Sequence, residues 1–212
     1  MARQRGWVVA VIAATALVIF GPAAPRATDL FDEIYEKGQP LESSLETLTA
    51  RFTETSSSPL LQRPLVARGV VSVLRPSKVR LDYDEPEART VLINDEVLTV
   101  VWPSRDLKQQ SNIGPAQRRI ERSFVAKSPA ELRSHFDIRA SVAADRAGTW
   151  LLHMTPKRRQ IREGLSTLEL WLDRETVMLQ AMRMTFPSGD TKLMEFAEVT
   201  INPPIDEAIF KK

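Results

Sequence analysis

Residues 69–102 read GVVSVLRPSKVRLDYDEPEARTVLINDEVLTVVW, and this stretch decides the fold. Near its centre, Val79, Leu81 and Tyr83 alternate with charged residues. A period of two is typical of a strand with one apolar face and one solvated face. Proline and acidic turn residues divide the stretch into about four pieces. We therefore expect short antiparallel strands that present one apolar face, which needs a cover.

The same alternation recurs on both sides of this stretch. We predict further strands at residues 48–53, 106–110, 136–142, 150–155, 165–172, 177–186 and 191–201. Residues 111–113 are expected to be loop, and residues 156–164 a basic loop. The predicted fold class is therefore mainly β (α+β), with a single strongly curved antiparallel sheet wrapped around short helices.

Three short helices are expected. The first covers residues 28–37 and ends at Gly38, and the second follows Pro40. The third begins at Ser128, where a serine cap, a proline in the first turn and Glu131 form a capping box, and it ends near Phe136.

The first 27 residues resemble a secretory signal peptide. Arg3 and Arg5 precede an apolar run from Trp7 to Phe20, which is short for a membrane span. An uncleaved anchor is the alternative. Residues 28–212 then form one mature domain, which is long enough for a proper core.

Removal of the signal changes the charge of the chain. Lys and Arg fall from 29 to 26 against 27 Asp and Glu, so the net charge changes from +2 to −1. Nucleic acid is therefore not an expected partner. The chain has no cysteine, which excludes disulfides, thiol nucleophiles and thiolate metal sites.

Residues that could support catalysis are sparse. The two histidines, His135 and His153, have no partner at ligand spacing, so we expect no metal site. Asp82, Asp84 and Glu85 could be read as an acid pair, but they lie at a predicted turn, where acids are common. We therefore expect neither catalytic residues nor a cofactor.

Two features leave alternatives open. Met178, Met182 and Met184 share one parity with Phe186, which indicates either core filling or a face that adapts to flexible alkyl chains. Arg118, Arg119 and Arg122 form a basic cluster, which is either a solvated face or a docking site for an acidic partner or an anionic headgroup.

The chain resembles the periplasmic outer-membrane lipoprotein carrier proteins, the LolA family, from about residue 45 to residue 210. The segments that carry the resemblance follow in the family's order: Leu48–Glu54, Leu74–Tyr83, Val91–Glu96 with Trp102-Pro103, Leu152–Lys157, Leu168–Asp173, Phe196–Val199 and Ile201–Pro204. The arginine-proline pair before an alternating strand is the most specific of them.

The resemblance implies an incomplete, half-open β-barrel with a short helical lid over an apolar cavity for acyl chains. It places a lid latch on Arg75, which would bond to backbone carbonyls of the lid, and it places Val79 and Leu81 on the cavity wall. A surface arginine at a bend is the alternative for Arg75. The candidate cavity residues are Val71, Val73, Arg75, Val79, Leu81, Tyr83, Trp102, Leu168, Leu170, Met182 and Met184.

The implied function is non-catalytic transport by a monomer in the periplasm. The carrier would receive an acylated lipoprotein from an inner-membrane transporter and deliver it to an outer-membrane acceptor. Transport of another lipid beside a membrane transporter, and sensing of lipid or stress by a binding protein, are the alternatives. An enzyme acting on lipid or glycan is a further alternative, for which the sequence offers no site.

Overall fold

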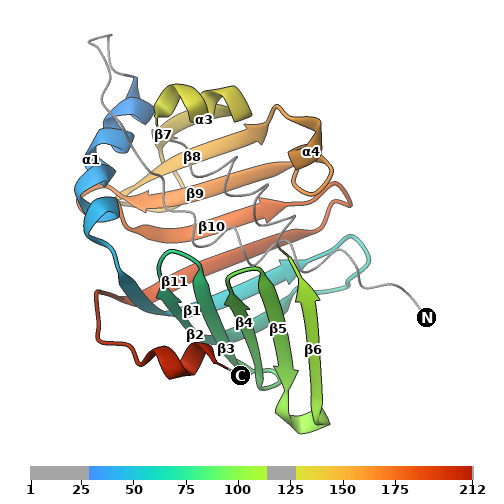
Figure 1. Ribbon diagram of the computed structural model, residues 1–212. Helices are drawn as coiled ribbons and strands as arrows, with labels where there is room; N and C mark the ends of the chain where they lie inside the picture. The colour runs from blue at the N-terminus through green and yellow to red at the C-terminus, as the bar shows by residue number, and fades with distance from the viewer. Residues whose placement is uncertain (1–28, 114–127, 212) are drawn as a thin grey trace.

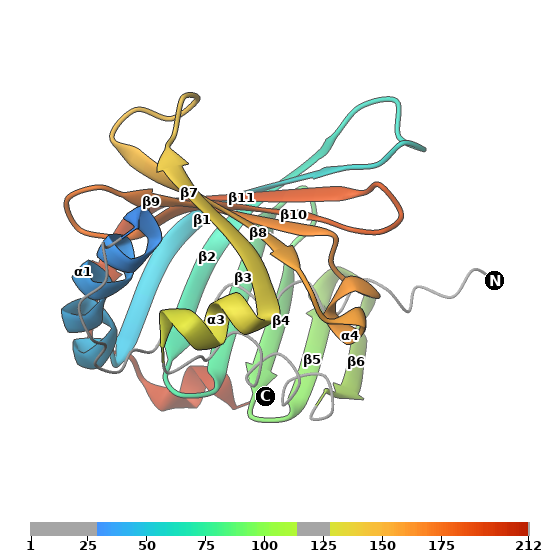
Figure 2. The ribbon, with the colours of Figure 1, turned by 90° about the horizontal axis from the view of Figure 1, so that it is seen from above.

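The computed structural model describes residues 29–113 and 128–211. Within these ranges, eleven strands form one antiparallel sheet with the order β6-β5-β4-β3-β2-β1-β11-β10-β9-β8-β7. Strands β6 and β7 lie at opposite edges and do not pair, so the barrel is open. Figures 1 and 2 show the sheet curling, with α1 and α3 near the β7 edge. These features confirm the predicted fold class, a single curved sheet in a half-open barrel.

The sheet consists of two consecutive meanders that meet at its centre. The strands are β1 (Thr47–Ser57), β2 (Leu65–Leu74), β3 (Lys78–Glu85), β4 (Arg89–Asn94), β5 (Val97–Trp102), β6 (Leu107–Asn112), β7 (Phe136–Val142), β8 (Thr149–Pro156), β9 (Thr167–Asp173), β10 (Leu179–Thr185) and β11 (Thr191–Ile201). Strand β1 pairs with β11, which joins the first six strands to the last five.

The helices are short and lie between or before these strands. They are α1 (Leu30–Ser44), α3 (Pro129–His135) and α4 (Arg159–Arg162), with 3₁₀ turns η2 (Pro103–Arg105) and η3 (Glu207–Phe210). The third predicted helix is confirmed, because the Ser128 side chain accepts a hydrogen bond from the Glu131 amide at 3.2 Å. The segment 156–164, predicted as a basic loop, contains the short helix α4.

The first two predicted helices are one. Helix α1 runs through Gly38 and Pro40, and Asp29 caps it by accepting from the Asp32 amide at 3.0 Å. Glycine and proline weaken a helix interior, but tertiary contacts outweigh this tendency. Phe31 is buried on the N-terminal side of Gly38 and Pro40, and Glu42 is buried on their C-terminal side, so both halves of the helix are held by the rest of the protein.

Strand β6 also differs from the prediction. It extends to Asn112, whereas residues 111–113 were expected to be loop. Ser111 pairs with Leu98 and Asn112 with Val97, so backbone pairing continues although every side chain of β6 is exposed. A polar edge strand has no apolar alternation by which its end could be located.

One hydrophobic core occupies the concave side of the sheet. Buried residues of α1 and α3, such as Phe31 and Leu132, belong to the same cluster as Leu81 and Met182 of the sheet. The two helices therefore pack against the concave face, as the predicted lid requires. Phe210 of η3 is buried outside this cluster. Its helical turn lies against the other face of β3, where Arg80 donates to the Ile209 carbonyl oxygen at 2.6 Å.

Candidate functional site

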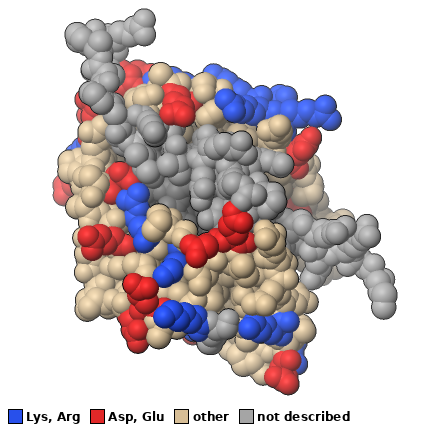
Figure 3. Space-filling view, in the orientation of Figure 1, with Lys and Arg blue, Asp and Glu red and all other residues tan. Residues whose placement is uncertain are grey.

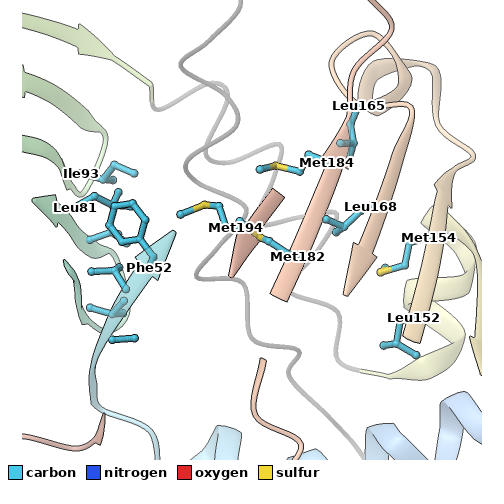
Figure 4. Close-up of a cluster of buried hydrophobic side chains, with 14 of the residues drawn as sticks. Phe52, Leu81, Ile93, Leu152, Met154, Leu165, Leu168, Met182, Met184 and Met194 are labelled. Atoms are coloured by element: carbon cyan, nitrogen blue, oxygen red, sulfur yellow. The ribbon is translucent and has the colours of Figure 1, made fainter. Parts of the chain in front are cut away.

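The concave face brings two walls of different composition opposite each other. Figure 4 shows Leu81 and Ile93 on one side and Met182, Met184 and Met194 on the other. The first wall comes from β2, β3 and β4, and the second from β8 to β11. The walls lie in different meanders, so they face each other only because β1 pairs with β11.

We call the first side the branched wall. Its buried members have branched aliphatic side chains in register across three strands: Val71, Val73, Val79, Leu81, Val91 and Ile93. Val71 lies opposite Leu81, and Leu81 opposite Val91. Directly paired residues share a face, so the alternation read from residues 69–102 gives a continuous apolar surface.

We call the second side the methionine wall. Its buried members are Leu152, Met154, Leu168, Met182, Met184 and Met194. Met182 lies opposite both Met194 and Leu170, and Met184 opposite Leu168. Leu170 is half-buried and packs against the same cluster. The structure thus places four predicted cavity residues, two methionines and two leucines, on this wall.

Two residues of interest lie outside the walls. Met178 precedes β10 and does not join the cluster, because a register shift between Leu179 and Ala181 breaks the parity predicted for it. Trp102 ends β5, is half-buried, and lies opposite Leu107 of the edge strand β6.

Arg75 joins the β2–β3 turn to the end of α1. Its Nη1 donates to the Glu42 carbonyl oxygen at 2.7 Å and to the Leu45 carbonyl oxygen at 3.4 Å. Its Nη2 forms an ion pair with the Glu42 carboxylate at 2.5 Å. The Arg75 side chain is 28% exposed and the Glu42 side chain 11%. Such a charge-assisted contact at a helix end, where carbonyls lack helical partners, is suited to holding the helix on the sheet.

A polar cluster interrupts the concave face on the two central strands. The Glu54 carboxylate on β1 accepts from Lys192 Nζ at 2.8 Å, from the Tyr83 hydroxyl at 2.8 Å and from the Ser56 hydroxyl at 3.3 Å. Burial, with the nearby Glu54 charge, raises the pKa of the Tyr83 phenol well above its usual value. The phenol therefore remains protonated and donates to Glu54.

We define this polar cluster as Glu54, Ser56, Tyr83 and Lys192. Of these residues, only Tyr83 was predicted from the sequence to belong to the site. One signal was available. Glu54 follows Phe52 at a spacing of two, and Lys192 precedes Met194 at the same spacing. A charged residue at an inward position of a strand is unusual and predicts a buried polar contact.

The acidic residues considered for catalysis do not form a pair: Asp82 lies on the strand face opposite to Leu81, and Asp84 and Glu85 are exposed at the end of β3. Asp82 accepts from Arg80 Nε at 2.5 Å and from the Thr90 hydroxyl at 2.7 Å, and Glu85 forms an ion pair with Arg68. Within residues 29–113 and 128–211, no group of three or more His, Cys, Asp or Glu residues could hold a metal ion.

Basic residues gather over α4. Figure 3 shows a patch of basic side chains over α4, where Arg158 and Arg162 are exposed. The predicted cluster of Arg118, Arg119 and Arg122, like residues 1–27, lies outside the described residues. No helix of the part that the structure describes is long and apolar enough to cross a membrane.

Known proteins share both the sequence pattern and the fold. An outer-membrane lipoprotein carrier protein of Coxiella burnetii is 23% identical over 179 residues, which cover 81% of this chain and 78% of that protein. An uncharacterised conserved protein of Thermus thermophilus superposes with a TM-score of 0.54 at 13% identity, over 87% of this chain and 94% of that one.

The family profile described as "Outer membrane lipoprotein carrier protein LolA" matches residues 43–212. This range begins at the end of α1 and includes every strand of the sheet and both walls. The resemblance found in the sequence is confirmed: the chain belongs to the LolA family of outer-membrane lipoprotein carrier proteins.

Proposed function

We propose that the mature chain is a periplasmic carrier that shields the acyl chains of lipoproteins, or of another exported lipid, between the branched wall and the methionine wall. The observation that carries this proposal is the pair of apolar walls on the concave face, with Leu81 on one wall and Met182 on the opposite one. Family membership supports the same class of cargo.

The physical need for such a carrier follows from the cost of exposing acyl chains. Each CH₂ group contributes about 0.8 kcal/mol when it leaves water, so one long chain carries on the order of 10 kcal/mol of aversion to water. An acylated protein therefore needs an apolar sheath to cross an aqueous compartment. The sheath must also release its cargo, which favours apolar contact over a large set of fixed hydrogen bonds.

Arg75 is the proposed latch of this carrier. Opening the space between α1 and the sheet would break its contacts with Glu42 and Leu45. Helix α3 would move with α1, because Arg133 of α3 bonds to Asp32 at 2.5 Å and also to Asp29. A lid held by a few charge-assisted bonds can populate an open state, which cargo then stabilises.

The proposed partners follow from this route. Residues 1–27 would act as the signal for export. An inner-membrane transporter would load the monomeric carrier, and an outer-membrane acceptor would unload it. No catalytic step or cofactor is required, because loading and release are changes of binding partner.

Mass spectrometry of material that co-purifies with the mature protein from its own periplasm tests the function directly. We expect acylated peptides or intact lipoproteins. Phospholipid or another lipid as the main species would assign the carrier to that lipid. Absence of any acylated molecule, while the same preparation takes up no added acyl probe, would contradict the carrier proposal.

Replacement of the latch tests the mechanism. We expect Arg75→Leu to load cargo as the wild type does but to release it poorly, because the closed lid no longer gains the contacts with Glu42. The measurement is transfer of a fluorescent acylated peptide to acceptor vesicles. Arg51→Leu is the control, because Arg51 is exposed on β1. Wild-type transfer by Arg75→Leu would exclude the latch role.

A further inference from the structure

Acyl-chain binding does not account for the polar cluster. Glu54 and Lys192 have side chains only 7% and 8% exposed, and they lie on β1 and β11 at the centre of the sheet. Their nearest inward neighbours along these strands are Phe52 and Met194. Two apolar residues at positions 54 and 192 would make the apolar surface of the concave face continuous.

Stability does not explain the cluster either. Removing two charges from water costs several kcal/mol per ion in general, and a buried ion pair often stabilises a protein no more than well-packed apolar residues do. The Glu54 carboxylate nevertheless gathers three donors, from Ser56, Tyr83 and Lys192. A buried polar group so completely bonded is held in a fixed position, as a binding site requires.

Arg89 adds a cation next to this cluster. It lies opposite Tyr83 in the β3–β4 register, so it shares the concave face, and its guanidinium carbon is 3.7 Å from the centroid of the Tyr83 ring. Arg89 is half-buried and makes no salt bridge within the described residues. The nearby Glu87 carboxylate interacts with Arg89 at longer range, but its salt bridge is with Arg105, at 2.7 Å. Together, Glu54, Lys192 and Arg89 have a net charge of +1.

We propose that Arg89 and the polar cluster bind the anionic group of an amphiphile, a phosphate or a carboxylate at its polar end, while its acyl chains lie on the two walls. This inference rests on the proposed carrier function and deepens it. A guanidinium group offers paired N–H donors that match the oxygens of these anions. Stacking on the Tyr83 ring fixes the plane of the Arg89 guanidinium group. The cargo would thus be oriented with its charged end over the central strands.

Three fluorescent probes with the same pyrene-labelled acyl chain test the proposal on the mature protein: a phosphatidylglycerol, a fatty acid and an uncharged diacylglycerol. We expect the wild type to bind one or both anionic probes about tenfold more tightly than the diacylglycerol. The stronger of the two anionic probes distinguishes a phosphate from a carboxylate. Arg89→Gln should remove this preference and leave diacylglycerol binding unchanged.

Two further variants keep the test decisive. Arg51→Gln removes an exposed arginine from β1 and should bind every probe as the wild type does. The double variant Glu54→Leu with Lys192→Met replaces the buried pair by apolar residues and should keep diacylglycerol binding while the anion preference falls. Circular dichroism verifies that each variant is folded.

The outcomes separate the two proposals. Equal wild-type affinity for charged and uncharged probes would overturn the anion site and leave the carrier function standing. An equal decrease in affinity for all three probes in Arg89→Gln would also overturn the anion site, because Arg89 would then affect only the shape of the cavity. Failure of the wild type to bind any probe would overturn the carrier function itself.

Discussion

The branched wall and the methionine wall are both buried but differ in chemistry. Leu81 is 1% exposed and Met182 is 0% exposed, so burial does not distinguish them. Valine and isoleucine have few side-chain rotamers, whereas methionine has three rotatable bonds and fills irregular gaps. We infer that the first meander gives the cavity a fixed shape and that the second adapts to what lies in it.

Each wall contains one register shift, and the shift in β2 lies at a close backbone approach. In the branched wall, β2 and β3 shift register at Gly69, and a Cβ atom added there would lie 2.0 Å from the Asp82 carbonyl oxygen. The β9–β10 pair of the methionine wall shifts register between Leu179 and Ala181. The backbone of β3 therefore leaves no room for a side chain at position 69 of β2.

The largest effect is expected for Gly69→Ala. The added methyl group would contact backbone atoms, which cannot move without breaking the β2–β3 ladder, so the free energy of unfolding should fall by at least about 3 kcal/mol. Urea unfolding measures this change. Gly164→Ala is the control, because its nearest atom is 3.9 Å away, and it should cost far less. Equal effects of the two substitutions would show that the close approach is not limiting.

Cavity-forming substitutions should separate the walls next. Leu81→Ala should lower the free energy of unfolding by about 3 kcal/mol. Met182→Ala removes a side chain of similar size but should cost less, because Met184 and Met194 can shift into the space. Urea unfolding measures the free energy of unfolding of both variants. A decrease for Met182→Ala that equals or exceeds the decrease for Leu81→Ala would contradict the assignment of an adaptable wall.

The chain has two tyrosines, and both should resist ionisation. Burial raises the pKa of Tyr83, with the Glu54 charge adding to it, and burial also raises that of Tyr35, with Glu131 and Glu42 adding. The unfolded chain ionises at its ordinary value of about 10. The contribution of the two protonated tyrosines to the free energy of unfolding should therefore be fully present below about pH 10 and decrease as the pH rises above that value.

Tyr83→Phe tests this pH dependence on the branched wall. It should cost about 1–2 kcal/mol near neutral pH, because Glu54 loses one donor, and it should weaken the fall in stability above about pH 10. Urea unfolding at several pH values, followed with ultraviolet absorption of tyrosinate, measures both. Tyr35→Phe serves as the comparison. Native-state tyrosinate near pH 10 would contradict the expected burial effect.

The sequence predicted the branched wall better than the methionine wall, and the reason is local. Val79, Leu81 and Tyr83 alternate without interruption, so their shared face follows from strand geometry alone. Met178 shows the opposite case. Its spacing from Met182 predicted that both side chains lie on the same face of the sheet. The register shift between Leu179 and Ala181 moves Met178 off that face, and such a shift depends on the partner strand.

Long-range contacts explain the other differences. The sequence predicted that Pro40 would divide two helices, but it could not reveal that Arg75 holds Glu42 on the far side of that proline. Glu54 and Lys192 are 138 positions apart. Neither was singled out from the sequence, because the pairing of β1 with β11 is needed to bring them together.

The smallest effect on stability is expected when one residue of a wall is replaced by the residue type of the other wall. Met182→Leu and Leu81→Met conserve volume, so each should change the free energy of unfolding by less than about 1.5 kcal/mol. Their effects on binding should nevertheless be opposite. Met182→Leu should narrow the range of acyl chains bound, and Leu81→Met should widen it, because the number of accessible side-chain shapes changes in opposite directions.

A set of fluorescent fatty acids with straight, kinked and branched chains measures this range. In the wild type, affinities across the set should differ little, because the methionine wall adapts to each chain. In Met182→Leu, the kinked and branched chains should bind more weakly relative to the straight one. If both variants keep the wild-type order and spread of affinities, side-chain freedom does not set the selectivity, and the shape of the sheet itself must do so.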